Sequence, residues 1–380
     1  MLTRPFVLVL CVQFCFGLSY STFFLLPKFL DRQFHARADA IGAVAATALL
    51  ASVLASPWTG AWLDRGSRRP FISYGAVVNG LSGCAFALIH AISWPIFALR
   101  VVHGVSYALV FNGIVTLAAD LAPPRKLGQA IGLCGAASIV ANAIAPAIAE
   151  PVADRQGWGM VFLLAGGAAL VAALLSLGIR EAALASVREP PNAAALPSAL
   201  ALLREPQRIG AFVCSAANGA AFGVMFTYTQ PFALSLGASK VSSFFLGYTL
   251  VALSVRLLLG SVADAWGRRR VALAALVLYG LVECLTSLLR PNLLFAVGAG
   301  LGFSHGLLYP SINALAAEGI PRARRGAVMS YFFGCFGAGS ALWVLGSGVV
   351  AKWHGYPVVF VATGVLAWCS IAFLPKKARV

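Results

Sequence analysis

The feature that most constrains this chain is a series of apolar runs, each about as long as a bilayer is thick. Hydrophobic residues make up 60% of the 380 positions and charged residues only 11%, whereas a soluble chain carries about 25% charged residues. A helix of ~20 apolar residues crosses the hydrocarbon core. The hydropathy predicts about twelve such spans, near residues 5–27, 39–62, 71–92, 94–118, 129–150, 158–179, 209–230, 241–262, 271–290, 292–316, 326–350 and 356–375. The predicted fold class is an all-α integral membrane protein.

The basic residues indicate how the chain is oriented. The first span, 5–27, is too long for a signal-peptide core and lacks a small-residue cleavage site, so we expect a membrane helix there. With the N-terminus in the cytoplasm, 19 of the 28 Lys and Arg residues lie in cytoplasmic segments, which is the pattern of the positive-inside rule. We therefore expect a multi-pass protein of a bacterial-type cytoplasmic membrane with both termini inside. The net charge of +16 then favours anionic lipid headgroups, and not nucleic acid, as the partner.

Signatures of enzymes and metal sites are missing from the sequence. The eight cysteines lie inside apolar stretches without CxxC or Cys/His spacing, so we interpret them as packing residues. The chain has no phosphate-binding loop, no G-x-S-x-G and no HExxH. We expect no enzyme activity, no cofactor and no bound metal. The energy source is then an ion gradient, most simply of protons, or the gradient of the substrate itself.

The chain divides into two related halves. A hydrophilic segment at 180–208 separates six predicted spans at 1–179 from six at 209–380. Three segments of the first half recur in the second, at offsets of 200, 198 and 198 residues. They are Gly60–Arg69 with Gly260–Arg270, Ala119–Gly128 with Ala317–Gly326, and Gly157–Phe162 with Gly355–Phe360. Three matches in the same order indicate a duplicated protein.

The first repeated segment resembles the signature loop of the major facilitator superfamily, G-x-x-x-D-R-x-x-R-R. The resemblance covers the whole chain, and it extends to efflux-type members that move drugs, sugars or siderophores. It implies two pseudo-symmetric six-helix bundles that alternate access to a central cavity. The first copy departs from the pattern at Ser67, where glycine is expected, which leaves the local turn open.

An aspartate at the end of a cytoplasmic helix opposes the helix dipole and needs a partner. By the resemblance, Asp64, Arg68 and Asp120, and likewise Asp264, Arg268 and Glu318, would form two charge clusters that lock the cytoplasmic side. The alternative is that these residues are solvated charges that only set topology. The full predicted gate comprises Gly60, Asp64, Arg65, Arg68, Asp120, Gly260, Asp264, Arg268 and Glu318.

Arg100 is the most informative single residue. It lies within the fourth span, where an arginine costs at least ~2.5 kcal/mol at the bilayer centre and must find a partner. The spacing Arg100-x-x-x-Gly104 resembles a pattern of proton-coupled members, in which the arginine assists coupling. The alternatives are a structural pair, with Glu150 as the expected partner, or contact with an anionic substrate.

Other embedded polar residues divide between coupling and packing. Glu283 lies deep in the ninth span, and His103 and His305 lie in the fourth and tenth spans, so all three are further coupling candidates. The alternative for Glu283 is a protonated or structurally paired carboxyl, and the alternative for the two histidines is a hydrogen-bonded packing residue. Arg256 is close enough to a span end to reach the headgroups.

Polar residues of the first, fourth, seventh and tenth spans are the candidates for contact with substrate, because by the resemblance these spans line the cavity. They are Gln13, Tyr20, Asn112, Asn218, Tyr228, Gln230, Tyr309 and Asn313. The alternative for each is a hydrogen bond between helices.

The leading functional hypothesis is a monomeric, proton-coupled exporter of a small organic solute. The fifth span contains Ala145-Pro146-Ala-Ile-Ala149-Glu150, which resembles a degenerate form of a motif of exporters. An uptake symporter or facilitator is the second hypothesis, and a polytopic membrane enzyme is the third. The sequence does not name the solute.

Overall fold

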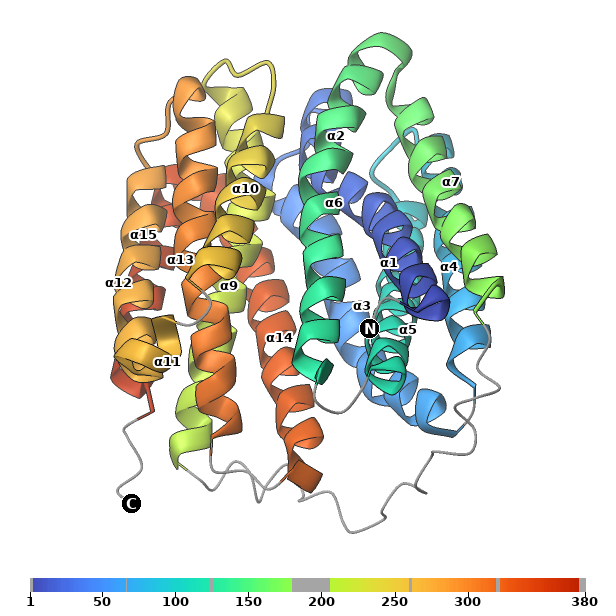
Figure 1. Ribbon diagram of the computed structural model, residues 1–380. Helices are drawn as coiled ribbons and strands as arrows, with labels where there is room; N and C mark the ends of the chain where they lie inside the picture. Colours follow the sequence, from blue (N-terminus) through green and yellow to red (C-terminus); the bar gives the residue numbers. More distant parts are fainter. Residues whose placement is uncertain are drawn as a thin grey trace. The chain divides into compact units, whose positions relative to one another are not determined.

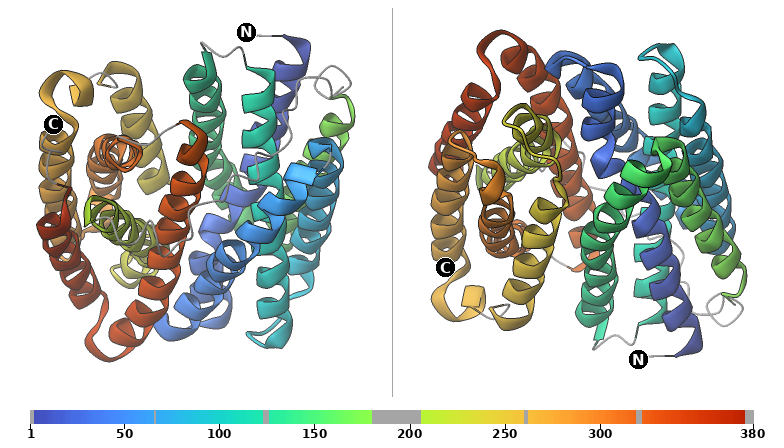
Figure 2. Two further views of the ribbon diagram at one scale, coloured as in Figure 1. Left: turned by 90° about the horizontal axis from the view of Figure 1, so that it is seen from below. Right: turned by 90° about the horizontal axis from the view of Figure 1, so that it is seen from above.

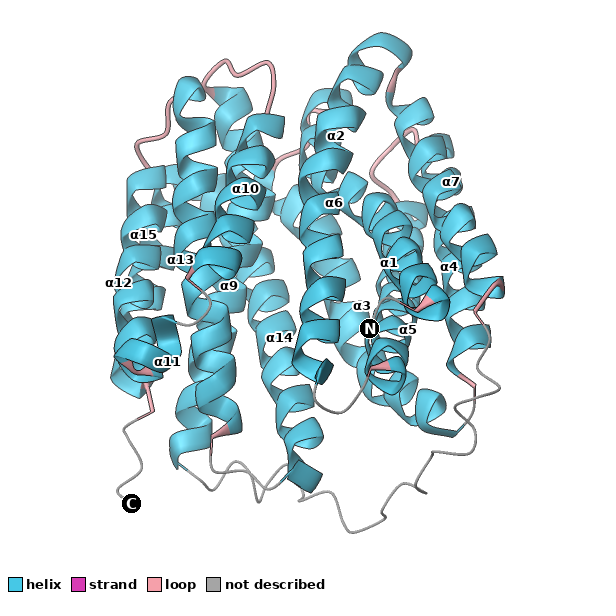
Figure 3. Ribbon diagram, in the orientation of Figure 1, coloured by secondary structure: helices cyan, strands magenta, loops and turns pink. Residues whose placement is uncertain are grey.

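The chain is helical throughout the part that the structure describes. The computed structural model describes residues 3–65, 67–122, 126–179, 206–259, 262–318 and 322–375, and no strand occurs within these ranges (Figure 3). By its contacts the chain forms two units. Unit 1 comprises Met1–Phe34 and Thr47–Pro191, and unit 2 comprises His35–Ala46 and Asn192–Val380. Most of the predicted linker, 180–205, lies outside the described residues.

The helices follow the predicted spans closely (Figure 1). The first half contains α1 (Arg4–Thr22), η1 (Phe23–Leu25), α2 (Leu26–Phe34), α3 (Ala38–Arg65), α4 (Arg68–Ala85), η2 (Phe86–Leu88), α5 (Trp94–Leu121), α6 (Leu127–Gln156) and α7 (Trp158–Leu177). The second half contains α9 (Pro206–Ser235), α10 (Ser242–Leu258), α11 (Val262–Trp266), α12 (Arg268–Thr286), η4 (Pro291–Leu293), α13 (Leu294–Ala317), α14 (Arg322–His354), α15 (Tyr356–Ser370) and η5 (Ile371–Phe373).

Ten helical segments in the described ranges are long and apolar enough to cross a membrane. The remaining two predicted spans correspond to α10, a shorter apolar helix of 17 residues, and to α12, which begins with three arginines. The eighth predicted span, 241–262, ends four residues early, and the separate short helix α11 follows.

The same helix pairs pack in each unit; Figure 2 shows the helices of each unit seen along their length. In unit 1, α4 packs on α5 and α7, and α1 packs on α6 and α7. In unit 2, α12 packs on α13 and α15, and α9 packs on α14 and α15. The pairs correspond one to one, so the duplication seen in the sequence is also a duplication of packing.

Glycines repeat at the closest helix contacts. A side chain at Gly104 would meet the backbone of Ala48, and one at Gly302 would meet the backbone of Tyr248. Gly302 follows Gly104 by 198 residues, and Tyr248 follows Ala48 by 200 residues. The two contacts are therefore equivalent in the two halves. Small residues are required there because helices in a membrane associate largely by close packing.

The turns before α7 and α15 are also duplicated. Gly157 and Gly355 precede these helices with φ of 84° and 81°, a conformation that glycine adopts without steric cost. The turn before α12 uses Gly267 with φ of 91°, whereas Ser67 before α4 has φ of −63°. The departure at Ser67 therefore does change the local turn.

The first predicted span was ended too early, at Pro27. The single turn η1 connects α1 directly to α2, and Pro27 occupies the start of α2, where its missing N–H costs no hydrogen bond. The helical segment continues to Phe34 and brings Lys28 against Glu150 of α6. Lys28 Nζ lies 2.6 Å from Glu150 Oε1, with side-chain exposures of 4% and 0%.

The Lys28–Glu150 ion pair generates a stability prediction. Removing one member of a buried pair leaves an uncompensated charge and costs about 3–5 kcal/mol, whereas apolar replacement of both is often neutral. We expect Lys28→Met to lower the thermal unfolding temperature of the purified protein and Lys28→Met/Glu150→Met to restore it. Equal destabilisation by the single and double variants would contradict an energetic role of the pair.

Candidate functional site

Within the first predicted gate cluster, Arg68 and Asp120 are in contact. Arg68 begins α4 and Asp120 lies in the last turn of α5, and these two helices pack together. Arg68 Nε lies 3.3 Å from Asp120 Oδ2, with the arginine buried and the aspartate 29% exposed. Gly60, Asp64 and Arg65 belong to the last turns of α3, but their side chains lie outside the described part. The gating role of the cluster stays a prediction.

The second predicted cluster is described only in part. Arg268 begins α12 and is partly exposed, and Glu318 caps the end of α13 with an exposed side chain. Gly260 and the side chain of Asp264 lie outside the described residues. The end of α13 is instead held by Arg208, whose Nη1 donates to the backbone oxygens of Ala316, at 3.1 Å, and Glu318, at 3.5 Å. Arg208 is not among the residues singled out from the sequence, and its position just after Pro206 at the start of α9 is the signal that could have found it.

Arg100 lies in an aromatic environment inside unit 1. Its side chain is 7% exposed, and its guanidinium carbon lies 6.0 Å from the ring centre of Phe23, within the range of a cation–π contact. His103, one turn further along α5, packs edge-on against Phe23 at 4.2 Å and in parallel against Phe86 at 5.2 Å. Neither ring nitrogen of His103 has a hydrogen bond among the described groups. The contacts of His103 are therefore those of a ring packed among other aromatic rings.

Glu150, the expected partner of Arg100, forms its ion pair with Lys28. The carboxylate does not end its helix as predicted, because α6 continues past Pro151 to Gln156. Sequence reasoning missed Lys28 because Pro27 was taken as the end of the first span, which placed the lysine in a loop.

Unit 2 contains the other two coupling candidates. Glu283 of α12 is fully buried, and neither carboxylate oxygen has a hydrogen bond among the described residues. His305 of α13 is also buried, and its Nδ1 lies 3.1 Å from the hydroxyl of Tyr248 on α10. Both residues are therefore buried in the interior of unit 2, and His305 alone of the two has a side-chain hydrogen-bond partner among the described residues.

Half of the cavity candidates form hydrogen bonds within or between helices. Gln13 donates to Ser138, Asn112 to Thr59, Tyr228 to the oxygen of Val344, and Gln230 to the oxygen of Phe226. In these four the packing interpretation has direct support.

The other four cavity candidates differ from one another. Tyr20 stacks on Tyr107 at 4.1 Å between ring centres, and Tyr309 packs among aromatic rings of α13 and α14. Asn313 is partly exposed. Asn218 is buried, and its side-chain oxygen and nitrogen have no hydrogen bond among the described groups. Asn218 is therefore the strongest of these candidates for binding a polar group of a solute.

One ion pair was not predicted at all. Lys352 Nζ, in the last turn of α14, lies 2.6 Å from Asp39 Oδ2 in the first turn of α3, with the two side chains 23% and 30% exposed. Close packing surrounds the pair, because side chains at Gly42 and Gly348 would meet the hydroxyl of Tyr228. The two charges are 313 residues apart, and no local pattern connects them.

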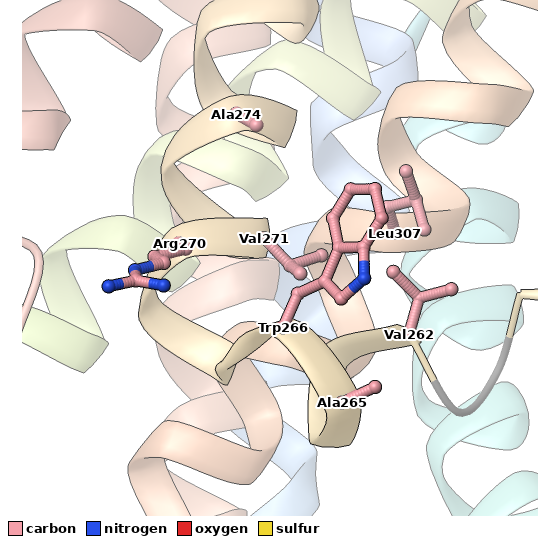
Figure 4. Close-up of a pocket in the computed structure, with 7 residues that line it drawn as sticks. All are labelled: Val262, Ala265, Trp266, Arg270, Val271, Ala274 and Leu307. Carbon is pink, nitrogen blue, oxygen red and sulfur yellow. The ribbon is translucent and has the colours of Figure 1, made fainter.

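A shallow hollow lies on the surface of unit 2 where α11, α12 and α13 meet (Figure 4). Trp266, Val262 and Leu307 line it, and the guanidinium group of Arg270 points away from the indole ring. The embedded polar residues described above are not among its lining residues, so the hollow adds nothing to the candidate site.

Comparison with known proteins identifies the family. The model of the Major Facilitator Superfamily matches residues 9–256 and 211–379. The chain is 23% identical to a multi-drug resistance efflux pump, PmrA, of Streptococcus pneumoniae over 87% of this chain and 84% of that protein. It is 26% identical to an uncharacterized transporter of Mycobacterium tuberculosis over 86% and 81%. A shorter match, 28% identical, joins 42% of the chain to 39% of Multidrug resistance protein 2 of Bacillus subtilis.

Solved structures share the fold at low identity. A mutant of the nucleoside transporter NupG matches with a TM-score of 0.82 and 14% identity, covering 97% of this chain and all of that chain. A POT family transporter in complex with a conjugated peptide matches with a TM-score of 0.78 and 14% identity, over 98% and 94%. With the helix order, the paired packing and the family model in agreement, the chain belongs to the major facilitator superfamily and is a multi-pass membrane transporter, not an enzyme.

Proposed function

We propose that this transporter exports a small organic solute in exchange for protons. The observation that carries the proposal is the set of ionisable side chains buried inside apolar helices, at Arg100, at Lys28–Glu150 and at Glu283. Such residues are rare in membrane spans and commonly mark ion or substrate pathways. A chain without a nucleotide-binding loop needs an ion gradient to move a solute uphill, and a buried carboxyl is a group that can bind and release a proton.

Export, and not uptake, is favoured by the relatives. Two of them are described as multidrug resistance or multi-drug efflux proteins. Pro146 lies inside α6, in the segment that resembles the motif of exporters. Uptake of an anionic solute is the second candidate, and the observation in its favour is the buried cation at Arg100.

Transport in this family alternates between two open states around a midplane site, so contacts at one membrane face must break in one of the states. Within unit 2, Asp39–Lys352 joins the first turn of α3 to the last turn of α14. We assign this pair to holding α3 against α14, and Arg68–Asp120 to the cytoplasmic side.

Proton coupling is tested with purified protein in vesicles that carry an imposed pH gradient. Ethidium, a permanent cation, and fluorescein, an anion, serve as probes, with pyranine inside the vesicles to report pH. We expect one probe to be moved against its gradient with a proton flux in the opposite direction, and both signals to vanish when the pH gradient is collapsed. Probe movement without proton flux would contradict coupling, and fluorescein moving together with protons would favour the uptake alternative.

The role of Asp39–Lys352 in holding α3 against α14 is tested by thiol accessibility of Val344→Cys, a buried position beside Gly42, in a background without the native cysteines. A partly exposed ion pair contributes about 0.2–1 kcal/mol. We therefore expect Asp39→Asn to raise the labelling rate of this cysteine by up to about fivefold.

The exchanged pair Asp39→Lys/Lys352→Asp should return the rate toward that of the parent. Asp154→Asn is the matched control, because it removes an exposed carboxylate elsewhere and should leave the rate unchanged. An unaltered rate in Asp39→Asn would show that the pair does not hold α3 against α14.

A further inference from the structure

The interior of unit 2 contains polar groups whose hydrogen-bonding capacity is unmet by the described residues. Glu283 is 0% exposed, and both of its carboxylate oxygens are buried without a partner. Tyr279, one turn earlier on α12, is also fully buried, and its hydroxyl has no partner either. Residues four apart lie on one face of a helix, so the two groups share the same buried face of α12.

A third polar group reaches this face from the neighbouring helix. The ring of His305 on α13 lies 6.3 Å from the ring of Tyr279, and its Nε2 is buried without a hydrogen bond. Its other ring nitrogen faces the hydroxyl of Tyr248 at 3.1 Å. A carboxyl, two phenols and an imidazole therefore lie in series across α12, α13 and α10.

The surroundings of Glu283 offer little compensating charge. α15 contacts this part of α12 through Gly364 and Trp368, which are uncharged, and α9 contributes the apolar ring of Phe222 beside His305. α11 precedes α12 and lies at its opposite end. The titratable or charged groups on this side of unit 2 are Tyr279 and Cys284 of α12, His305 and Tyr309 of α13, and Tyr248 and Arg256 of α10.

The corresponding positions in unit 1 contain no carboxyl group. Gly166 packs onto Gly80 and Cys84 in unit 1 as Gly364 packs onto Gly280 and Cys284 in unit 2, which places residues 79 and 83 in register with residues 279 and 283. Asn79 accepts a hydrogen bond from Ser19 and donates one to Ser106, and residue 83 is glycine. The same helix packing forms in unit 1 with glycine at residue 83. The fold therefore does not require a carboxyl at position 283.

An isolated carboxylate is unfavourable in a dry interior, and such a group becomes neutral by binding a proton. The protonated form of Glu283 is therefore the one compatible with the closed site. When water reaches the carboxyl, the ionised form is favoured near neutral pH, because a hydrated glutamate titrates at about 4.3. Closing and opening this site would thus bind and release one proton.

We infer that Glu283 is the proton-binding residue of this transporter, with Tyr279 and His305 as positioning residues. On release, the O–H bond of the carboxyl breaks, its electron pair stays on the carboxylate, and the proton passes to water; loading is the reverse. The inference rests on the proposed proton-coupled function, and it places the proton in unit 2, separate from Arg100 in unit 1.

The bound proton can be observed directly, without knowing the solute. We expect the infrared spectrum of the purified wild type at neutral pH to contain the C=O band of a protonated carboxylic acid, and Glu283→Gln to lack it. Glutamine has the shape of a protonated glutamate, so the fold should survive. Thr286→Val is the matched control, because among the described residues this buried hydroxyl on the same helix donates to the backbone oxygen of Val282 and its loss should leave the band in place.

Transport supplies the second measurement. In the vesicle assay, we expect Glu283→Gln to lose pH-driven accumulation of the transported probe by about tenfold or more, while exchange of probe across the membrane without net proton movement persists. An unchanged infrared band, or full pH-driven accumulation in Glu283→Gln, would overturn the inference. If Glu283→Gln does not fold, Glu283→Asp replaces it: a shifted acid band supports the inference and an unshifted one overturns it.

The two proposals fail in different ways. A wild type that moves probe without protons overturns the proposed function, whatever the infrared band shows. A wild type that couples normally, with Glu283→Gln coupling equally well, overturns only the assignment of the proton to Glu283.

Discussion

The structure depends on one constraint: inside a bilayer, a polar group finds no water and must be satisfied by the protein itself. Helices meet this requirement for the backbone, and glycines such as Gly104 and Gly302 let the helices approach closely enough to exclude lipid. The charges that remain are matched at specific contacts, including Lys28–Glu150 inside unit 1 and Arg68–Asp120 where α4 begins. Each contact fixes the position of one helix relative to another.

The duplication kept the same helix packing in both halves but changed the polar side chains inside it. The two halves share glycine contacts, helix pairs and the turns at Gly157 and Gly355. Inside that frame, unit 1 meets its polar needs through Asn79, whereas unit 2 places the carboxyl of Glu283 at a position where unit 1 has glycine. A repeated scaffold can thus carry a polar network in one half and a titratable group in the other.

Hydropathy predicted the spans well because the length of a membrane helix is set by bilayer thickness, and the offsets of 198 and 200 residues predicted the paired packing. The partners of individual side chains were harder to predict from the sequence. The contact between Asp39 and Lys352 joins residues that are far apart in the sequence. Arg208 falls at the end of the predicted linker, where no pattern indicates its partner. Lys28 was misplaced for a local reason, since proline usually ends a helix but can also begin the next one.

The early position of Lys28 affects how unit 1 is made. Its partner Glu150 follows 122 residues later, and a lysine left unpaired within a membrane segment is unfavourable. During synthesis the ammonium group must therefore wait near the headgroups, or with water, until α6 has been inserted. The helical segment that carries Lys28 can therefore take its final position only after α6, and the fifth span determines when the bundle closes around the ion pair.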